Sequence, residues 1–177
     1  MSAEHSAIHQ FLHLPTKITL HCRCGEPLSV TGPPFRCING HEEWFSPKPV
    51  AVAILRVGPT VVLVQRAIAP KIGDWCLPGG FVQRGETFAA AAARELFEET
   101  GISIPIANFM YLCEAAVMEA GVNLVFFVAF WPDGVPLPAF EHDDESFAVM
   151  TCPINALTEN MAFPTHVDAI RKASEIS

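Results

Sequence analysis

Three glutamates, Glu95, Glu98 and Glu99, lie within five residues of the chain, in a segment that carries helix signals at both ends. Thr87 is a suitable N-cap, and Gly101 can adopt the left-handed conformation that commonly ends a helix. At about 100° per residue, Glu98 and Glu99 lie roughly 60° and 40° to either side of Glu95. The sequence therefore predicts one helix that gathers three carboxylates on a narrow arc.

The other side of this helix is expected to be buried against a sheet through Ala89, Ala93, Leu96 and Phe97. Glutamates at such density repel one another unless a cation lies among them, and hard divalent cations prefer oxygen ligands. A solvated acidic surface is the competing interpretation. The glycines of Pro78-Gly79-Gly80 precede the helix and would let backbone carbonyls approach a ligand, which favours the cation site.

The whole segment is similar to the Nudix box. It runs Gly80-x5-Glu86-x7-Arg94-Glu95-Leu96-x-Glu98-Glu99-x-Gly101-Ile102 and agrees with that box at every defined position. The preceding Trp75-Cys76-Leu77-Pro78-Gly79 is the usual approach to it. Gln83 departs from the pattern, since many members carry a glutamate there. The resemblance implies that Glu95, Glu98 and Glu99 bind Mg²⁺ or Mn²⁺, together with the Gly79 carbonyl.

Catalysis at such a site needs a carboxylate that removes a proton from the attacking water. Glu98 or Glu95 could do so, although metal ligation competes with that role. Arg94 lies next to the acidic arc, where it could contact the substrate. It could equally pair with Glu86 and brace the preceding loop against the helix.

A second acidic cluster, Glu141 to Glu145, stands before the apolar run that starts at Ser146. Nudix proteins often place a functional glutamate just ahead of such a strand, so the resemblance implies Glu145 as a further metal ligand or base. Glu141 and Asp144 are the alternatives for that role. An ordinary acidic loop is the competing interpretation.

Four potential zinc ligands lie in a Pro- and Gly-rich segment near the N-terminus, in the order Cys22-x-Cys24, twelve residues, Cys37-x3-His41. Two ligand pairs at this separation are typical of a zinc ribbon with one tetrahedral Zn²⁺. His21 could replace Cys22 or His41, and a disulfide or unliganded thiols are the other possibilities. The three remaining cysteines, Cys76, Cys113 and Cys152, lie in apolar contexts and are expected to be buried thiols.

The sequence predicts a tail over residues 1–17, a zinc-ribbon-like segment over 18–48 and a Nudix hydrolase domain over 49–177. Apolar runs predict strands over 50–57, 60–66, 108–118, 122–131 and 146–151, and a closing helix over 164–174. Strands mixed with two helices, without regular alternation, indicate an α+β protein. The resemblance makes this an α/β/α sandwich with a mixed sheet, preceded by a small zinc ribbon.

The formal net charge of −8 disfavours non-specific binding of nucleic acid, which needs a basic surface. The apolar run 122–131 is too short to cross a bilayer, and residues 1–14 do not have the pattern of a secretory signal. The expected protein is therefore cytoplasmic and binds neither nucleic acid nor membrane. The resemblance implies a homodimer.

The resemblance implies a metal-dependent hydrolase that cleaves the pyrophosphate linkage of a nucleoside diphosphate derivative. A ribbon ahead of the catalytic domain is similar to NADH, FAD and ADP-ribose pyrophosphatases, so a dinucleotide or ADP-ribose is the first expectation. A nucleoside triphosphate pyrophosphohydrolase and a non-catalytic nucleotide-sensing module are the alternatives. Trp75, Phe81 and Phe140 could stack on a base, although aromatic side chains near a sheet commonly belong to the core.

Overall fold

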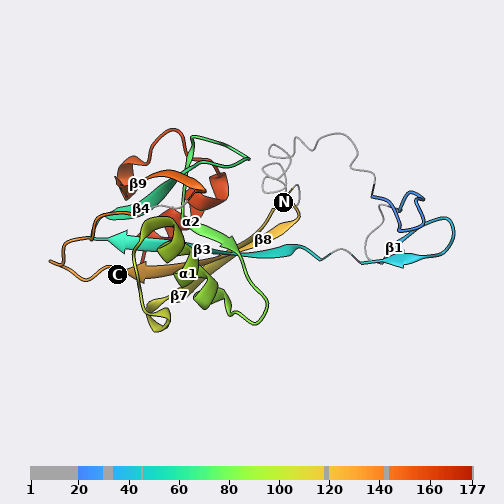
Figure 1. Cartoon of the computed structure of the whole chain (residues 1–177), viewed down its shortest axis with the longest axis horizontal. Helices are drawn as coiled ribbons and strands as arrows, with labels where there is room; N and C mark the ends of the chain where they lie inside the picture. Colours follow the sequence, from blue (N-terminus) through green and yellow to red (C-terminus); the bar gives the residue numbers. More distant parts are fainter. Residues whose placement is uncertain (1–19, 30–33, 45, 118–119, 142–143, 177) are drawn as a thin grey trace, which may run out of the picture. The chain divides into compact units, whose positions relative to one another are not determined.

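The computed structural model describes residues 20–29, 34–44, 46–117, 120–141 and 144–176. The chain divides into two compact units, Met1–Pro47 and Lys48–Ser177, and each is considered by itself (Figure 1). The smaller unit contains β1 (Phe35–Arg36) and β2 (Glu42–Glu43). The elements of the larger unit are β3 (Lys48–Val57), β4 (Thr60–Arg66), β5 (Trp75–Cys76), β6 (Gly79–Phe81), α1 (Phe88–Thr100), η1 (Ile106–Asn108), β7 (Met110–Val117), β8 (Val122–Phe130), β9 (Ser146–Pro153), η3 (Ile154–Ala156) and α2 (Pro164–Ser174).

A mixed sheet forms the centre of the larger unit, with the strand order β5-β4-β3-β8-β7. In addition, β6 pairs with β3 and β9 pairs with β4. β3 runs parallel to β8 and antiparallel to β4 and β6. The combination of parallel and antiparallel pairs confirms the predicted mixed sheet.

The sheet splits between β3 and β4. These two strands pair next to their hairpin turn, at Arg56↔Val61 and Val57↔Thr60. Further along, β5 pairs with β4 through Val64↔Cys76, whereas β6 pairs with β3 through Val52↔Gly79. The chain therefore crosses from β4 to β3 at the two residues between β5 and β6. This crossing brings Gly79 and Gly80, at the start of the box, next to the helix α1.

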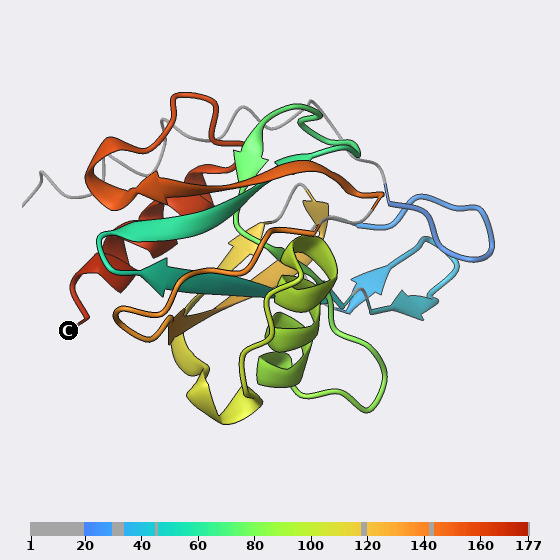
Figure 2. The same ribbon diagram turned by 60° about the vertical axis from the view of Figure 1, so that its left-hand side comes forward.

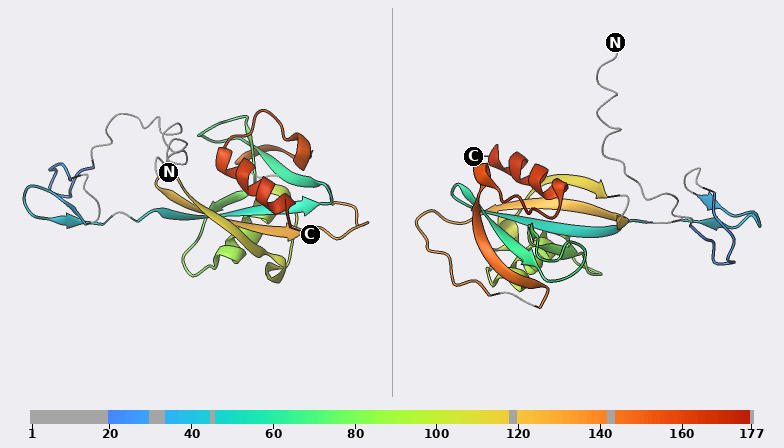
Figure 3. Two further views of the ribbon diagram at one scale, coloured as in Figure 1. Left: turned by 180° about the vertical axis from the view of Figure 1, so that it is seen from behind. Right: turned by 90° about the horizontal axis from the view of Figure 1, so that it is seen from above.

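Side chains of β3 alternate between the two faces of the sheet, as the period of a strand requires. Ala51, Ala53 and Leu55 pack with Ala91, Ala92 and Leu96 of α1. Val52 and Ile54 pack with Ala169, Ile170 and Ala173 of α2. The helices thus cover opposite faces, with α1 nearer the viewer in Figure 2 and α2 in front of the sheet in the left-hand view of Figure 3. The predicted α/β/α sandwich is confirmed.

Both predicted ends of α1 are confirmed. The Thr87 side chain accepts a hydrogen bond from Ala90 N, and Gly101 has φ 74° and donates its N–H to Phe97 O. The predicted buried face was wrong in part, because Phe97 is 55% exposed. Ala91 and Ala92, the smallest side chains available, face the sheet and let the helix approach it, which turns Phe97 to solvent.

The orientation of α1 against the sheet also determines where its acidic arc lies. Glu99 is only 8% exposed and lies on the buried side of α1, together with Leu96. The carboxylates therefore do not oppose the buried face, as the sequence suggested, but overlap with it. The overlap brings acidic groups up to the split in the sheet.

Most other predicted elements are present with small shifts at their ends. β4 and α2 have the predicted bounds, β3 begins at Lys48, and β8 ends at Phe130. β9 extends to Pro153, and Asn108 ends the helix η1 and is not the start of a strand. The short strands β5 and β6 were not predicted, and Met118 and the tail 1–17 lie outside the described residues.

Cys76 and Cys152 are buried as predicted, whereas Cys113 is only half-buried because β7 is an outer strand of the sheet. Among the residues that the structure describes, no helix is long and apolar enough to cross a membrane.

Candidate active site and metal centre

Gly79 and Gly80, the glycine turn where the box begins, lie against two different neighbours. A Cβ atom placed on Gly80 would lie 2.6 Å from Glu95 Oε2, and one placed on Gly79 would lie 2.6 Å from Ala51 O and 2.9 Å from Val52 Cα. Neither position has room for a side chain, which is the close approach that glycine permits. Gly79 therefore lets the turn lie directly against β3, and Gly80 lets the Glu95 carboxylate lie directly against the backbone of the turn.

Arg94 is the centre of an ion-pair network on α1. Its Nε and Nη2 donate to Glu86 at 3.0 and 3.1 Å, and its Nη1 donates to Glu95 Oε1 and Glu98 Oε2, both at 2.7 Å. Nη2 also donates to Phe81 O at 3.2 Å. Arg94 thus braces the loop against the helix, and it orients two of the three carboxylates.

The ionisation of these groups follows from the network. Hydrogen bonds from Arg94 lower the pKa of Glu86, and the Glu86 carboxylate in turn raises the pKa of Arg94. Burial raises the pKa of Glu95 despite the opposing effect of Arg94, and the negative charges of Glu98 and Glu145 raise it further. A divalent cation would relieve this repulsion.

Glu99 and Glu98 have different surroundings. The buried Glu99 accepts a hydrogen bond from Gly79 N at 3.3 Å, which ties the glycine turn to the last turn of α1. The Glu98 side chain is 47% exposed. Glu99 is therefore held in place by the fold, whereas solvent reaches Glu98.

Two residues of the second acidic cluster, Glu141 and Glu145, lie near α1 and the box. Ala67 N donates to Glu145 O at 2.7 Å, and the Glu145 charge acts on Glu95. Glu141 N donates to Thr100 O, so Glu141 lies at the C-terminal end of α1. Asp144 is an exposed neighbour of Glu145 in the sequence. The effect on Glu95 favours Glu145 over the two alternatives.

Replacing Gly80 with alanine is expected to weaken Mn²⁺ binding roughly tenfold with a modest loss of stability, because the new Cβ displaces the flexible Glu95 carboxylate. Gly79→Ala is the matched variant, since its Cβ meets backbone atoms of β3 and should lower the Tm more. Titration calorimetry and thermal unfolding distinguish the two. Equal Mn²⁺ affinity in wild type and Gly80→Ala would contradict the proposal that the contact of Gly80 with the Glu95 carboxylate supports metal binding.

A buried histidine lies behind the glycine turn, and sequence reasoning missed it because the preceding residues Phe163, Pro164 and Thr165 carry no sign of a polar site. His166 is 5% exposed, and its Nδ1 accepts a hydrogen bond from Leu77 N at 3.1 Å. The ring packs edge-on against Phe126, with centroids 5.6 Å apart. Burial, aided by the positive charge of Arg66, lowers the pKa of His166 to about 3.

Folding stability is expected to fall as the pH drops from about 6.5 towards 3, by up to about 1.4 kcal/mol per pH unit from this one group. In this window the unfolded chain binds a proton on His166 and the folded chain does not, whereas above 6.5 the full stability is present. Urea unfolding between about pH 7 and pH 5 measures the slope. His166→Asn should have a shallower slope, and an unchanged slope would contradict the prediction.

The four predicted zinc ligands come together in the smaller unit. Ligand atoms of Cys22, Cys24, Cys37 and His41 all lie within 4.8 Å of one another. Cys22 Sγ lies 3.6 Å from His41 Nδ1, and Cys24 Sγ lies 3.9 Å from Cys37 Sγ. This donor set of three sulfurs and one imidazole fits a tetrahedral Zn²⁺ site. His41 belongs to the group, while His21 forms a strand-like bridge with Pro27.

Two thiols of this group differ in pKa. The backbone N–H of Glu26 and the side chain of His41 lower the pKa of Cys24 to about 6. The backbone N–H of Cys24 favours the Cys22 thiolate, but burial and the neighbouring Cys24 and Cys37 thiols together outweigh it and raise the pKa of Cys22 to about 11. Three thiols this close oppose simultaneous ionisation unless a cation holds them, which is the chemistry of a zinc site.

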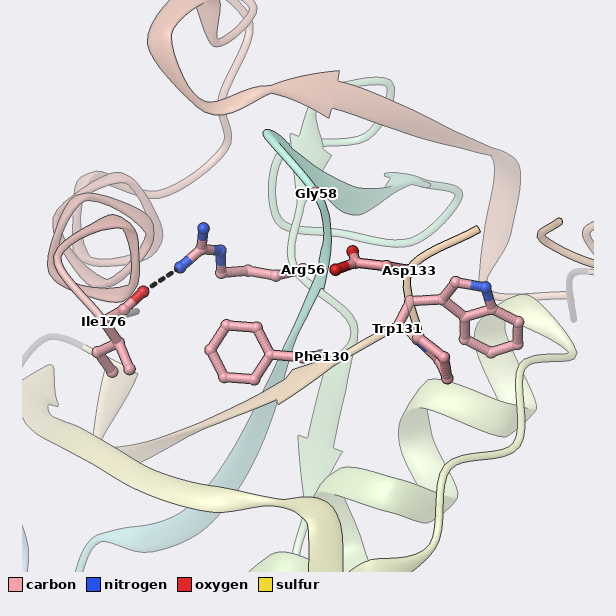
Figure 4. A pocket seen from close by; sticks show the side chains of 7 residues that line it. Arg56, Gly58, Phe130, Trp131, Asp133 and Ile176 are labelled. Atoms are coloured by element: carbon pink, nitrogen blue, oxygen red, sulfur yellow. Dashed lines mark hydrogen bonds between the residues drawn. The ribbon is translucent and has the colours of Figure 1, made fainter. Parts of the chain in front are cut away.

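A separate cavity of about 360 Å³ lies at the far end of β3 (Figure 4). Arg56 lines it and donates through Nη1 to Ala173 O at 3.0 Å and to Ile176 O, at the end of α2. Its guanidinium also lies over the Phe130 ring, 5.1 Å from the centroid. None of the box carboxylates lines this cavity. Its arginine, Arg56, binds backbone carbonyls at the C-terminal end of α2.

Comparison with known proteins gives a family match. The model described as the NUDIX domain matches residues 47–173. A Mycobacterium tuberculosis protein named as an 8-oxo-dGTP diphosphatase is 54% identical over 56 residues, 31% of this chain and 39% of that protein. The Haemophilus influenzae NAD-capped RNA hydrolase NudC is 33% identical over 118 residues, 64% of this chain and 44% of that protein. The chain thus spans about two fifths of the length of these relatives.

Among solved structures, a NUDIX hydrolase from Nitrosomonas europaea superposes with a TM-score of 0.66 at 24% identity, over 88% of this chain and 90% of that one. At this identity the match shows the shared fold alone.

Proposed function

The chain belongs to the NUDIX domain family, and on that premise we propose that it is a metal-dependent hydrolase of pyrophosphate linkages in nucleoside diphosphate derivatives. The observation that carries the proposal is the complete glutamate set of α1, gathered beside a glycine turn against which the Glu95 and Glu99 carboxylates lie. A non-catalytic sensor would be free to lose these acids, and this chain has kept all of them.

The residues of the site fit a magnesium or manganese ion. We assign Glu95, Glu98, Glu99 and the Gly79 carbonyl as ligands, with Glu145 as an additional one. Such ions neutralise phosphate charge and make a bound water more acidic. Arg94 keeps Glu95 and Glu98 in place through its pairing with Glu86.

In the proposed reaction a water oxygen forms a bond to one phosphorus, and the bond from that phosphorus to the bridging oxygen breaks. A carboxylate must take the proton that the water gives up. We assign this role to Glu98, because solvent reaches it most readily among the three glutamates of α1. Glu95 and Glu145 are the alternative bases.

For the substrate we propose a dinucleotide such as NADH or FAD, or ADP-ribose. An exposed aromatic side chain next to the glycine turn supports a base-containing substrate: Phe81 is 55% exposed, and Lys48 Nζ lies 5.4 Å from its ring centroid. The name of the NudC relative, an NAD-capped RNA hydrolase, agrees with an NAD-like group. The net charge of −8 keeps a small molecule, not RNA, as the first candidate.

A nucleoside triphosphate is the second candidate. It is favoured by the Mycobacterium tuberculosis relative, whose name specifies 8-oxo-dGTP and whose matched segment is 54% identical. A homodimer, a structural Zn²⁺ and a cytoplasmic location stay predictions.

The proposed function is tested by incubating the protein with Mg²⁺ or Mn²⁺ and separating the products by chromatography. The candidate substrates are NADH, FAD, ADP-ribose, dGTP, 8-oxo-dGTP and an NAD-capped RNA. Cleavage of NADH into two mononucleotides would support the first candidate, and turnover of triphosphates alone would select the second. No turnover of any of them would overturn the proposal.

A further inference from the structure

We infer that His166 is a positioning residue for the metal-binding turn, which it fixes by holding Leu77 N–H where the chain crosses from β4 to β3. The inference rests on the proposed function, because the turn is the segment that brings the Gly79 carbonyl and Gly80 to the box glutamates. His166 comes from α2, on the face of the sheet opposite to α1, and has no place in the Nudix box.

The crossing consists of Leu77 and Pro78, between β5 and β6. Proline has no N–H, so Leu77 carries the one backbone donor of the crossing. Leu77 is 1% exposed, and its N–H is bonded by His166 Nδ1 and not by a strand. Pro78 O accepts from Ala53 N at 2.8 Å. One side-chain bond and one backbone bond therefore hold the crossing.

The turn that follows contacts both helices of the sandwich. On one face of the sheet, Leu77 packs in the core cluster that contains α2. On the other face, Gly79 N donates to Glu99 of α1, and Gly80 lies against Glu95. The split between β3 and β4 allows this connection through the sheet. His166 is the point at which α2 holds the backbone of the metal-binding turn.

His166 is suited to this task because it stays neutral. An Nδ1 that accepts a hydrogen bond carries a lone pair, so the ring proton is on Nε2. The groups around the ring disfavour a second proton: Phe126 and Phe163 are apolar, and Arg66, on β4, is already a cation. The Leu77 N–H thus has a permanent acceptor over the working pH range.

Loss of the acceptor would leave a buried N–H without a partner, and buried donors that lose their partner are strongly disfavoured. The crossing would shift to recover a hydrogen bond, and Gly79 would shift with it. We expect Mn²⁺ binding roughly tenfold weaker, as for the loss of residues that orient metal ligands. kcat should fall at limiting metal, while the KM for the nucleotide should change less.

Two variants of His166 separate positioning from packing. His166→Leu keeps the apolar contacts with Phe126 and Phe163 but removes the acceptor. His166→Asn places an amide oxygen near the position of Nδ1 but removes the ring. Each variant is compared with wild type by Mn²⁺ titration calorimetry, by thermal unfolding, and by amide hydrogen exchange of Leu77 in metal-free protein.

His166→Leu is expected to show roughly tenfold weaker Mn²⁺ binding and faster Leu77 exchange, and His166→Asn to retain Mn²⁺ affinity within about threefold even if its Tm is lower. Wild-type affinity in His166→Leu, or losses of affinity in both variants that follow their Tm, would overturn the inference. If wild type binds no Mn²⁺ and cleaves no nucleotide, the proposed function fails and the inference with it. If wild type binds Mn²⁺ and cleaves a nucleotide, the proposed function stands, and the results for the two variants test the inference separately.

Discussion

Replacing Glu98 with glutamine is expected to lower kcat about 10³-fold, because the proposed base and a metal ligand are lost with one carboxylate. The fold should survive, since glutamine has almost the same shape and the Glu98 side chain is 47% exposed. The lost ion pair with Arg94 is partly solvated and contributes little to stability. Turnover of the best substrate at saturating Mg²⁺, together with the Tm, measures both effects.

The control for this experiment is Glu114→Gln. Glu114 is an exposed residue of β7, an outer strand of the sheet, and its substitution removes the same charge without touching the box. The control should keep wild-type kcat. Full activity in Glu98→Gln would rule out the assigned base, and an equal loss in both variants would indicate an effect of net charge.

Replacing Cys37 with serine is expected to abolish zinc binding and to unfold the smaller unit. The apolar cluster there is small, with Cys22, Leu28 and Cys37 as its buried members. A structural zinc contributes on the order of 10 kcal/mol to such domains, which exceeds what this cluster supplies by itself. Elemental analysis should fall from one zinc per chain to none, and amide protection around Leu28 should disappear.

Cys113→Ser provides the matched control, because Cys113 is a half-buried thiol of β7 and lies outside the four-ligand group. It should keep the zinc and the protected amides. Wild-type protein without zinc would contradict the assignment. Thiol titration of that protein would then show whether Cys24 and Cys37, whose sulfurs lie 3.9 Å apart, have formed a disulfide instead.

Features that depend on neighbouring residues in the chain could be predicted from the sequence. The ends of α1 were among them, because the Thr87 cap and the left-handed Gly101 act within a few residues. The same holds for the position of most strands, which the apolar runs marked, and for the order of the predicted zinc ligands. The spacing of the glutamates also placed them on one helix, since 3.6 residues per turn sets their angles.

The tertiary structure decided which face of α1 is buried against the sheet and which residues surround its glutamates. The contact of Ala91 and Ala92 with the sheet buried Glu99 and exposed Phe97, a choice that no local pattern encodes. The bond between Leu77 and His166 joins residues 89 positions apart, and it exists because the sheet splits and leaves one N–H without a strand partner. The sequence by itself thus determined which carboxylates could bind a cation, and packing across the sheet decided how they are held.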